Sequence, residues 1–416
     1  MPLTTESHMN DGRICFLMRN YLNSIPEGIT IASLNIFNAV SCLLKDRVSV
    51  ITLEEDTDLE GRKDAGPNPY TVFPIKAPTR NLSSALHWIT ETMKIGYVIK
   101  AIKKLDPRII HILNVTKETY IPMLRIFKRK KTLSLCHLYH SYHAFEDKHF
   151  YRYRFFKLRS LILRLKPFDH ILSTNRVLAR YLVNKLSLDK EYVHYIPFPI
   201  NTDYFHPVTK KHKNELRAKY RLPADKYIIG FVGSVVEPLR GFHILISALR
   251  HVLHYVSDVL LLVASIDPLT EDFRGVMKWK TPIEAINAYQ LSSHIVRLGY
   301  VPSINEVYQL SDAVVLPFTH PHHAMDPPLV ILEAMSCGLP VITTTVTSAC
   351  EIIDHGANGL IVKPNDEKAL AKEIISVIED RSLSKRLARN ARSKILSNFS
   401  MEVVGRKIVK LYESIT

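Results

Sequence analysis

Short apolar runs suited to β-strands alternate with amphipathic helical patterns along almost the whole chain. No other feature of the sequence limits the fold as strongly, because such an alternation builds parallel sheets covered by helices. In the first part of the chain the strand-like runs lie at 13–19, 48–53, 109–113, 132–136 and 170–173. The alternation then pauses and begins again, which predicts an α/β fold with two sheets rather than one.

A proline-rich connector at 196–207 marks the pause, since prolines interrupt regular helices and central strands. A polar, lysine-rich helix follows it, and new strand-like runs lie at 227–232, 259–264, 295–298, 313–316, 340–344 and 359–362. A helix opened by the segment 233–241 repeats its apolar side chains at 3.6-residue spacing, at Phe242, Leu245, Ile246, Leu249 and Val252. We therefore predict two Rossmann-like domains, at 1–197 and 198–398, whose parallel sheets face a central cleft. A last helix at 399–416 is expected to pack back on the first domain.

The chain is basic, and its charge is unevenly distributed. The 416 residues include 55 Lys and Arg against 40 Asp and Glu, a net charge of +15, while a hydrophobic content of 46% is ordinary for a globular protein. The stretch from Lys94 to Lys185 holds 21 basic and five acidic side chains. Such an excess favours an anionic partner, which the charge alone leaves open between nucleic acid, an acidic lipid surface and a phosphorylated substrate.

Three features indicate a cytoplasmic protein. The five cysteines are scattered and form no Cys-x-x-Cys pair, as expected in a reducing compartment. The first residues lack the basic and apolar regions of a secretory signal. The longest uncharged stretches, 28–44 and 334–350, are interrupted by polar residues or by glycine and proline, so neither is typical of a transmembrane helix.

The segment 325–342 reads as a helix followed by a strand. Asp326 suits the N-cap and Pro327 the first helical turn, and Gly338 with Pro340 ends the helix. The unpaired N–H groups at the start of this helix favour an anion or a sugar hydroxyl.

Glu333 lies inside this helix, next to the apolar run 329–332. A carboxylate among apolar neighbours needs a hydrogen-bonding partner, and a ribose diol is one candidate. The plainer alternative is a helix residue paired with a surface lysine.

With these residues the chain resembles GT-B-fold glycosyltransferases of the family 4 type, the glycosyl transferases group 1, which are retaining enzymes with nucleotide-sugar donors. The resemblance covers nearly all of the C-terminal half, in ordered blocks at 192–207, 233–248, 297–302, 311–317, 325–342 and 351–362. It implies that Glu333 holds the donor's ribose hydroxyls. It also implies that the helix start, at Pro328 and Leu329, meets the transferred sugar and phosphate. Other donor-site residues implied by the resemblance are Gly233, Tyr300 and Pro302.

The chain departs from the family pattern at three positions. The first glutamate of the Glu-x7-Glu motif is replaced by Met325, with Asp326 one residue nearer to Glu333. Asp326 either takes over the contact to the donor sugar or only caps the helix. Of the family's basic pair for the diphosphate, one position is Ser234 and the other is Arg240, whose guanidinium can still grip phosphate.

Two further positions match family elements of the first domain. His137 follows the strand-like run 132–136, where the family places a histidine against the donor sugar, and a strand-end histidine bonded to a carbonyl is the alternative. Gly28 is the one glycine near the turn where the family has a glycine-rich loop, and we expect it to serve the donor site, although an ordinary turn glycine is the alternative.

No metal or other cofactor is expected, because the family neutralises the leaving diphosphate with basic side chains and helix dipoles. Asp56-Thr-Asp58 lies in an acidic run typical of a solvated loop. The histidines at 137, 140 and 143, and those at 320, 322 and 323, lack a cysteine or a second cluster at ligand spacing.

The stretch 148–166 carries seven basic residues, no acidic ones and several aromatics. On a helix, together with 125–131, it favours peripheral contact with an anionic membrane on its inner face, whereas the alternative is a solvated rim around core residues. No motif that binds nucleic acid accompanies it, so we expect no nucleic-acid partner.

The sequence thus predicts a retaining glycosyltransferase that moves a hexose from a UDP- or GDP-sugar to a hydroxyl of a glycan or lipid-linked acceptor. The alternative is a catalytically degenerate GT-B protein that binds a glycan or a partner, as Met325, Ser234 and the single Gly28 would allow. An epimerase or a phosphorylase of the same fold has less support, since no lysine segment suits pyridoxal phosphate.

Overall fold

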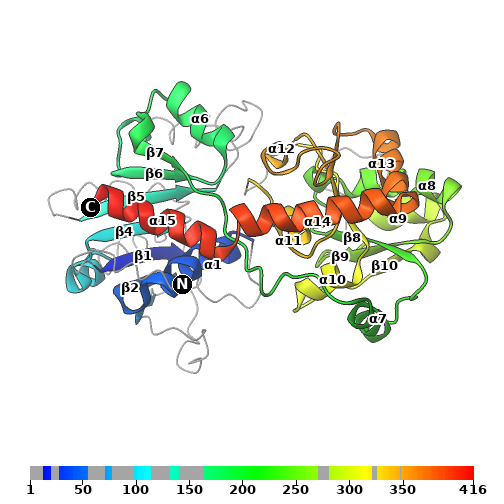
Figure 1. Ribbon diagram of the computed structural model, residues 1–416, viewed down its shortest axis with the longest axis horizontal. Coiled ribbons are helices and arrows are strands. Elements are labelled where there is room, and N and C mark those ends of the chain that lie inside the picture. The colour runs from blue at the N-terminus through cyan, green and yellow to red at the C-terminus, as the bar shows by residue number, and fades with distance from the viewer. Residues whose placement is uncertain are drawn as a thin grey trace, which may run out of the picture. The chain divides into compact units, whose positions relative to one another are not determined.

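The computed structural model describes residues 13–19, 28–54, 71–76, 98–113, 132–139, 163–269, 281–320, 326–346 and 348–416. The chain divides into two compact units (Figure 1). The first unit comprises Met1–Pro199 together with Met401–Thr416, and the second comprises Ile200–Ser400. The chain therefore leaves the first unit once and returns to it for its last helix.

The first unit is built on a sheet of seven parallel strands in the order β3-β2-β1-β4-β5-β6-β7. Its strands are β1 (Ile14–Arg19), β2 (Val48–Glu54), β3 (Thr71–Lys76), β4 (Ile109–Leu113), β5 (Leu133–Leu138), β6 (His170–Ser173) and β7 (Val193–Tyr195). The order reverses between β1 and β4, and ligands of such sheets bind beside the reversal, at the carboxyl ends of the strands.

Helices cover both faces of this sheet. The structure bounds α1 (Gly28–Leu44), α6 (Arg176–Asn184) and α15 (Met401–Ile415), with short 3-10 turns η1 (Lys45–Arg47) and η3 (Lys190–Tyr192), and residues 98–105 are helical as well. Helices α1 and α15 carry an aromatic layer on the face of Phe16 and His111, whereas α6 packs in the core of the other face. The last helix, α15, packs along α1 so closely that a Cβ on Gly405 would stand 2.3 Å from the carbonyl oxygen of Ala39. From the same helix, the Tyr412 hydroxyl reaches Nδ1 of His111 on β4 at 2.6 Å.

The second unit contains a sheet of six parallel strands in the order β10-β9-β8-β11-β12-β13. Its strands are β8 (Tyr227–Val232), β9 (Val259–Ala264), β10 (Ile295–Arg297), β11 (Ala313–Leu316), β12 (Val341–Thr344) and β13 (Leu360–Val362). Strand β9, Val-Leu-Leu-Leu-Val-Ala, is buried along its whole length, as expected for a strand covered on both faces. Here the strand order reverses between β8 and β11.

The helices of the second unit follow the periodicities of the sequence. They are α7 (Lys210–Lys219), α8 (Phe242–Tyr255), α9 (Pro282–Ala288), α10 (Ile304–Leu310), α11 (Leu329–Ser336), α12 (Ala349–Ile352), α13 (Glu367–Glu379) and α14 (Arg381–Asn398), with 3-10 turns η4 (Pro238–Arg240) and η5 (Ser292–His294). All five apolar side chains predicted to repeat along α8 are buried. The segment 233–241 leads directly into that helix, since it contains η4 and its last residue, Gly241, is the N-cap of α8.

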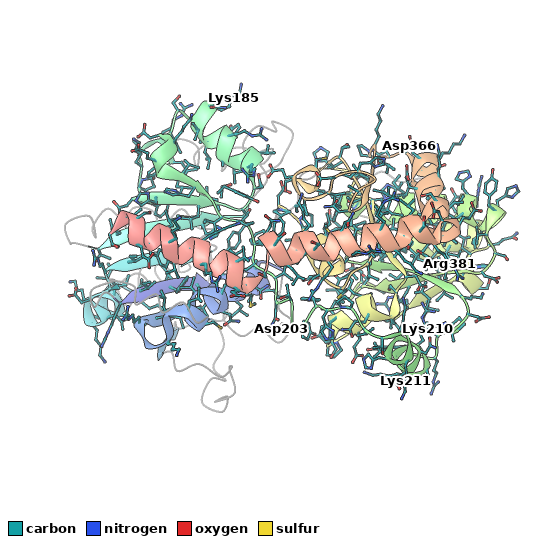
Figure 2. The ribbon with its side chains drawn as sticks, viewed as in Figure 1. Lys185, Asp203, Lys210, Lys211, Asp366 and Arg381 are labelled. Atoms are coloured by element: carbon teal, nitrogen blue, oxygen red, sulfur yellow. The ribbon has the colours of Figure 1, made fainter. Side chains whose placement is uncertain are left out.

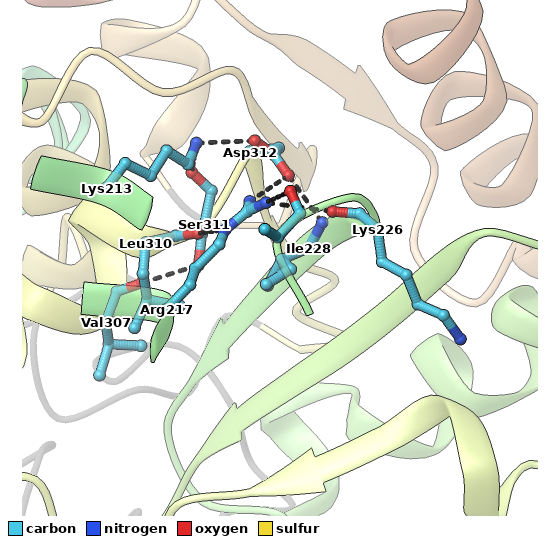
Figure 3. Close-up of polar contacts among 9 residues, drawn as sticks. Lys213, Arg217, Lys226, Ile228, Val307, Leu310, Ser311 and Asp312 are labelled. Carbon is cyan, nitrogen blue, oxygen red and sulfur yellow. Dashed lines mark hydrogen bonds and ion pairs between the residues drawn. The ribbon is translucent and has the colours of Figure 1, made fainter. Parts of the chain in front are cut away.

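Much of the charge of the lysine-rich helix α7 is structural. Arg217 is buried, and its guanidinium binds Asp312 at 2.6 Å, while Lys213 binds the other oxygen of the same carboxylate at 2.6 Å (Figure 3). Asp312 also accepts the backbone N–H of Ile228. This cluster joins α7 to the amino-terminal ends of β8 and β11. By contrast, Lys210 and Lys211 point outward from the start of α7 (Figure 2).

Two strands of the first sheet were not expected from the sequence, β3 and β7. Both are edge strands: β3 contains Pro74, and β7 has only three residues. The five cysteines all lie in the described residues, and none of them forms a disulfide. Among the helices of the described residues, none combines the length and the apolar character that crossing a bilayer requires.

Candidate functional site

The candidate site lies where the order of the second sheet reverses, at the carboxyl ends of β8 and β11. Directly after β8 come Gly233, at φ 143°, and Ser234. The Ser234 hydroxyl accepts the N–H of Glu237 at 3.0 Å, so this side chain stabilises its own loop. The loop is also tied to the loop that follows β9, since the N–H of Val235 is accepted by Asp267 at 3.1 Å.

Arg240 is the basic side chain at the end of this loop, as the last residue of η4. Its guanidinium lies over the Phe318 ring, 5.8 Å from the ring centre, and within the described residues it forms no hydrogen bond or ion pair. Burial lowers the pKa of Arg240, and the nearby Glu237 opposes that shift only in part. A desolvated cation without an anionic partner is suited to bind an anion such as phosphate.

The loop after β11 packs against the same turn. Gly241 has φ 73°, and a Cβ there would stand 1.8 Å from the carbonyl oxygen of Pro317, so the position requires glycine. Thr319 donates from its backbone to Leu239 at 3.1 Å and from its hydroxyl to Pro238 at 2.9 Å. These contacts hold Arg240 and Phe318 together.

The predicted cap of the next helix is wrong. Helix α11 begins at Leu329, its N-cap is Pro328 without a side-chain cap, and Pro327 lies before the helix rather than in its first turn. Asp326 instead turns to a different loop, where its Oδ1 accepts both the N–H and the hydroxyl of Ser348, at 2.9 and 2.8 Å. Asp326 thus fastens the start of α11 to the segment before α12, a role that we did not anticipate.

Burial raises the pKa of Asp326 to about 6, although both bonds from Ser348 favour the ionised form. Its side chain is held by Ser348, whether or not it also contacts a sugar. The stand-in role for the missing glutamate therefore stays a prediction, and Met325, the residue at the motif position, lies outside the described residues.

Glu333 lies in the middle of α11 and is almost fully buried, with 6% of its surface exposed. It has no lysine partner in the described part of the chain; its Oε2 accepts the hydroxyl of Tyr308 from α10 at 2.7 Å. Burial raises the pKa of Glu333 to about 7, and the Tyr308 bond works against that rise. Because the described residues offer this buried carboxylate one donor, it retains acceptor capacity for a ligand.

The remaining donor-site candidates lie in two different places. Tyr300 and Pro302 follow β10, the edge strand, and Tyr300 is 51% exposed. Pro328 and Leu329 are buried at the start of α11. The structure thus gathers Gly233, Ser234 and Arg240 at the reversal point and leaves Tyr300 and Pro302 two strands away.

In the first unit, His137 lies inside β5 rather than after the strand. Its Nε2 donates to the carbonyl oxygen of Ile196 at 3.2 Å, and its ring is stacked on that of His111 with centres 5.5 Å apart. Burial lowers the pKa of His137 to about 3, so the ring is neutral. The carbonyl bond that we considered as the alternative is therefore present, and contact with a donor sugar stays a prediction. Gly28 is the first residue of α1, and its role is also untested.

Other predictions fall partly or wholly outside the described residues. These include the Asp56–Asp58 pair, the histidines at 140, 143, 322 and 323, and the basic stretches 125–131 and 148–162. Among the residues that are described, no three His, Cys, Asp or Glu side chains are grouped as metal ligands.

Tyr308 and Ser348 are the site residues that the sequence did not indicate. Each is paired with a residue more than 20 positions away, Tyr308 with Glu333 and Ser348 with Asp326. Pairs so far apart produce no recognisable pattern in the sequence. The sequence indicated only that a buried carboxylate needs a hydrogen-bond donor.

Comparison with known proteins finds a family match that lies within the second unit. Residues 212–394 match the family described as "Glycosyl transferases group 1". The chain is 28% identical over 207 residues to the capsular polysaccharide biosynthesis glycosyltransferase CapM of Staphylococcus aureus, which is 48% of this chain and 50% of CapM. It is 26% identical over 204 residues to the putative glycosyltransferase YtcC of Bacillus subtilis (strain 168), 48% of each protein. The chain spans about half the length of these curated relatives.

Solved structures are similar over the whole chain. The crystal structure of HepE from Anabaena in complex with UDP has a TM-score of 0.74 at 20% identity and covers 97% of this chain and 100% of that chain. Sucrose-phosphate synthase from Thermosynechococcus elongatus has a TM-score of 0.75 at 19% identity, covering 97% and 99%. The chain therefore has the GT-B fold of two Rossmann-like units.

Proposed function

We propose that this GT-B protein is a glycosyltransferase whose second unit binds a nucleotide-sugar donor. The observation that carries the proposal is Glu333, a buried carboxylate with one hydrogen-bond donor in the described part of the chain, in the unit that matches the glycosyl transferases group 1 family. The two hydroxyls of a ribose would supply the further donors that this carboxylate lacks.

In this proposal Arg240 binds the diphosphate of the donor. Its guanidinium is desolvated and without an anionic partner among the described residues, at the point where the strand order reverses. The start of α11, at Leu329, adds unpaired N–H groups and the positive end of a helix dipole. Together they stabilise the negative charge that grows on the leaving nucleoside diphosphate, so the proposal includes no metal cofactor.

The reaction proposed is transfer of a hexose, with retention at the anomeric carbon, to a hydroxyl of a glycan or lipid-linked acceptor. Both UDP- and GDP-sugars fit this chemistry, and the UDP complex of HepE favours UDP. In this proposal Glu333 binds the ribose, and the donor phosphate helps to deprotonate the acceptor hydroxyl. An acceptor at a membrane surface would account for the basic stretch between Lys94 and Lys185.

The test is nucleotide binding to a Glu333→Ala variant, measured by isothermal titration calorimetry with UDP and with GDP. Glu306→Ala is a matched control, because Glu306 on α10 is half-buried and also accepts a tyrosine hydroxyl, that of Tyr220, at 2.7 Å. We expect at least about a tenfold loss of affinity for E333A, as for removal of a hydrogen-bonded charge, and wild-type affinity for E306A. Equal affinities of E333A and wild type would overturn the site assignment.

Ser234 supports one alternative, a GT-B protein that binds donor or glycan without catalysis. Its hydroxyl is engaged with Glu237, and one positive charge of the family's phosphate pair is missing. Release of free nucleoside diphosphate from UDP- or GDP-hexoses during incubation distinguishes the two. Release of nucleoside diphosphate supports a catalytically active glycosyltransferase. A donor that binds but stays intact supports a degenerate protein without catalysis.

A further inference from the structure

The hydrogen bond between Tyr308 and Glu333 has a second property besides its length of 2.7 Å: its donor is completely buried. Tyr308 has no exposed surface, and within the described residues its hydroxyl donates to the Oε2 atom of Glu333 alone. The other carboxylate oxygen, Oε1, accepts no hydrogen bond from the described residues. The two oxygens of Glu333 are therefore not equivalent.

The Tyr308 ring is itself held in place. It packs edge-on against Phe205, with ring centres 5.9 Å apart. The carbonyl oxygen of Phe205 accepts the guanidinium of Arg392 at 2.8 Å and the hydroxyl of Ser336 at 2.7 Å. Since Ser336 ends α11, the helix that carries Glu333 also fixes the residue that supports Tyr308.

We propose that Tyr308 is a positioning residue for donor recognition: by donating to Oε2 it fixes the Glu333 carboxylate so that Oε1 is presented to the ribose hydroxyls of the nucleotide. This inference rests on the proposed function. Without the Tyr308 bond, the carboxylate would be free to turn and would lose the one donor that favours its ionised form.

The ionisation of Glu333 makes the proposal testable through the pH dependence of nucleotide affinity. A purely structural role of Tyr308 would not change that pH dependence. The pKa of Glu333 is about 7 because burial raises it and Tyr308 opposes the rise. The other titratable groups of this neighbourhood are Tyr204, on the connector, and Cys337, after α11; burial raises the pKa of both, so they are neutral. Arg392, from α14, is the nearby cation.

The ionised carboxylate is the better acceptor for hydroxyls, so nucleotide affinity should rise as pH increases through about 7. Removing the Tyr308 hydroxyl takes away a stabiliser of the ionised form. The pKa of Glu333 then rises further, and the gain in affinity moves to higher pH.

The experiment compares wild type, Tyr308→Phe and Tyr220→Phe by calorimetric titration with UDP and GDP between pH 6 and 9. Tyr220 is the matched control, since its hydroxyl also donates to a glutamate at 2.7 Å, here Glu306. Protonation of the nucleotide's diphosphate affects the measured affinity equally for every variant. The informative quantity is therefore the shift along the pH axis between the affinity curves of a variant and of wild type. We expect Y308F to bind about tenfold more weakly at pH 7, to recover most of that loss by pH 9, and to move the curve up by about one pH unit. Y220F should follow wild type.

Parallel curves for Y308F and wild type, with or without a uniform loss of affinity, would overturn the proposal, because a structural role alone acts equally at every pH. Absence of nucleotide binding by the wild-type protein at all pH values would instead remove the proposed function together with this inference. If Y308F fails to fold, 3-fluorotyrosine at position 308 replaces it. The more acidic phenol is a stronger donor, so the curve should move to lower pH, and an unmoved curve would contradict the proposal.

Discussion

At the scale of single residues, two carboxylates buried beside the second sheet have different tasks. Glu333 is held by Tyr308 through one oxygen, whereas Asp326 receives both bonds of Ser348 on one oxygen. The apolar residues before Glu333 indicated from the sequence alone that its carboxylate needs a special partner. Nothing local indicated the partner of Asp326, because Ser348 lies 22 residues later and the helix starts at Leu329, beyond the expected cap.

Replacing Asp326 by Asn should stabilise the second unit at alkaline pH. The Asn oxygen can accept both Ser348 bonds without a buried charge. Because the pKa of Asp326 in the folded protein, about 6, exceeds the ordinary value of 3.8, the folded state binds more protons than the unfolded state between these pH values, and stability falls as pH rises through them. We expect D326N to raise the free energy of unfolding by about 2–3 kcal/mol at pH 8 and by about half of that at pH 5, measured by urea denaturation.

Asp380→Asn provides a control of opposite sign, since hydrogen bonds from Leu383 and Ser382 at the start of α14 lower the pKa of Asp380. The stability of D380N relative to wild type should therefore fall as pH rises, whereas that of D326N relative to wild type should increase. A D326N protein less stable than wild type at pH 8 would show that the charge of Asp326, rather than its hydrogen bonds, is what the site requires.

At the scale of elements, the sequence was sufficient wherever a strand is buried and apolar. The central strands β8, β9 and β11 were predicted with the bounds that the structure shows. The edge strands β3 and β7 were missed for physical reasons: an edge strand tolerates a proline such as Pro74, and a strand of three residues has too few side chains to show a period. Site loops were harder still, since their shape depends on contacts such as that of Gly241 with Pro317.

Gly405→Ala tests how closely α15 and α1 approach each other. In an exposed helix this substitution stabilises by about 0.5–1 kcal/mol, because alanine is the better helix former. Here the added Cβ would meet the Ala39 carbonyl oxygen at 2.3 Å, so we expect a loss of about 1–3 kcal/mol in the unfolding of the first unit, measured by calorimetry. Lys410→Ala, on the exposed side of α15, should change stability by less than about 0.5 kcal/mol. A stabilised G405A protein would contradict the contact.

At the scale of the whole molecule, the chain makes the first unit from two separate pieces. The second unit begins and ends at one place, where the N–H of Ile200 donates to the carbonyl oxygen of Phe399 at 2.7 Å. The restart of the strand pattern after the proline-rich connector was enough to predict two domains. It could not give their boundaries to the residue, because these depend on the pairing of Ile200 with Ser400 across 200 positions of sequence.

Deleting residues 401–416 should damage the first unit and spare the second. The deletion removes the buried side chains of Val404, Ile408 and Tyr412. At about 1.5–3 kcal/mol for each, their loss approaches the whole stability of a typical domain. In calorimetry we expect the transition of the first unit to fall or disappear, while that of the second unit and its nucleotide affinity stay near wild type. If the protein that lacks residues 401–416 no longer bound the nucleotide, the donor site would require an intact first unit.

The position of α15 also determines when each unit can be completed on the ribosome. The first 199 residues are made first, but their sheet receives its last covering helix only when the final residues have been translated. The roughly 200 residues of the second unit take about 10–40 s to synthesise in between. During that time the layer around Phe16 and His111 lacks the helix that carries Tyr412. The first unit therefore gains the helix that covers this layer only after all residues of the second unit have been made.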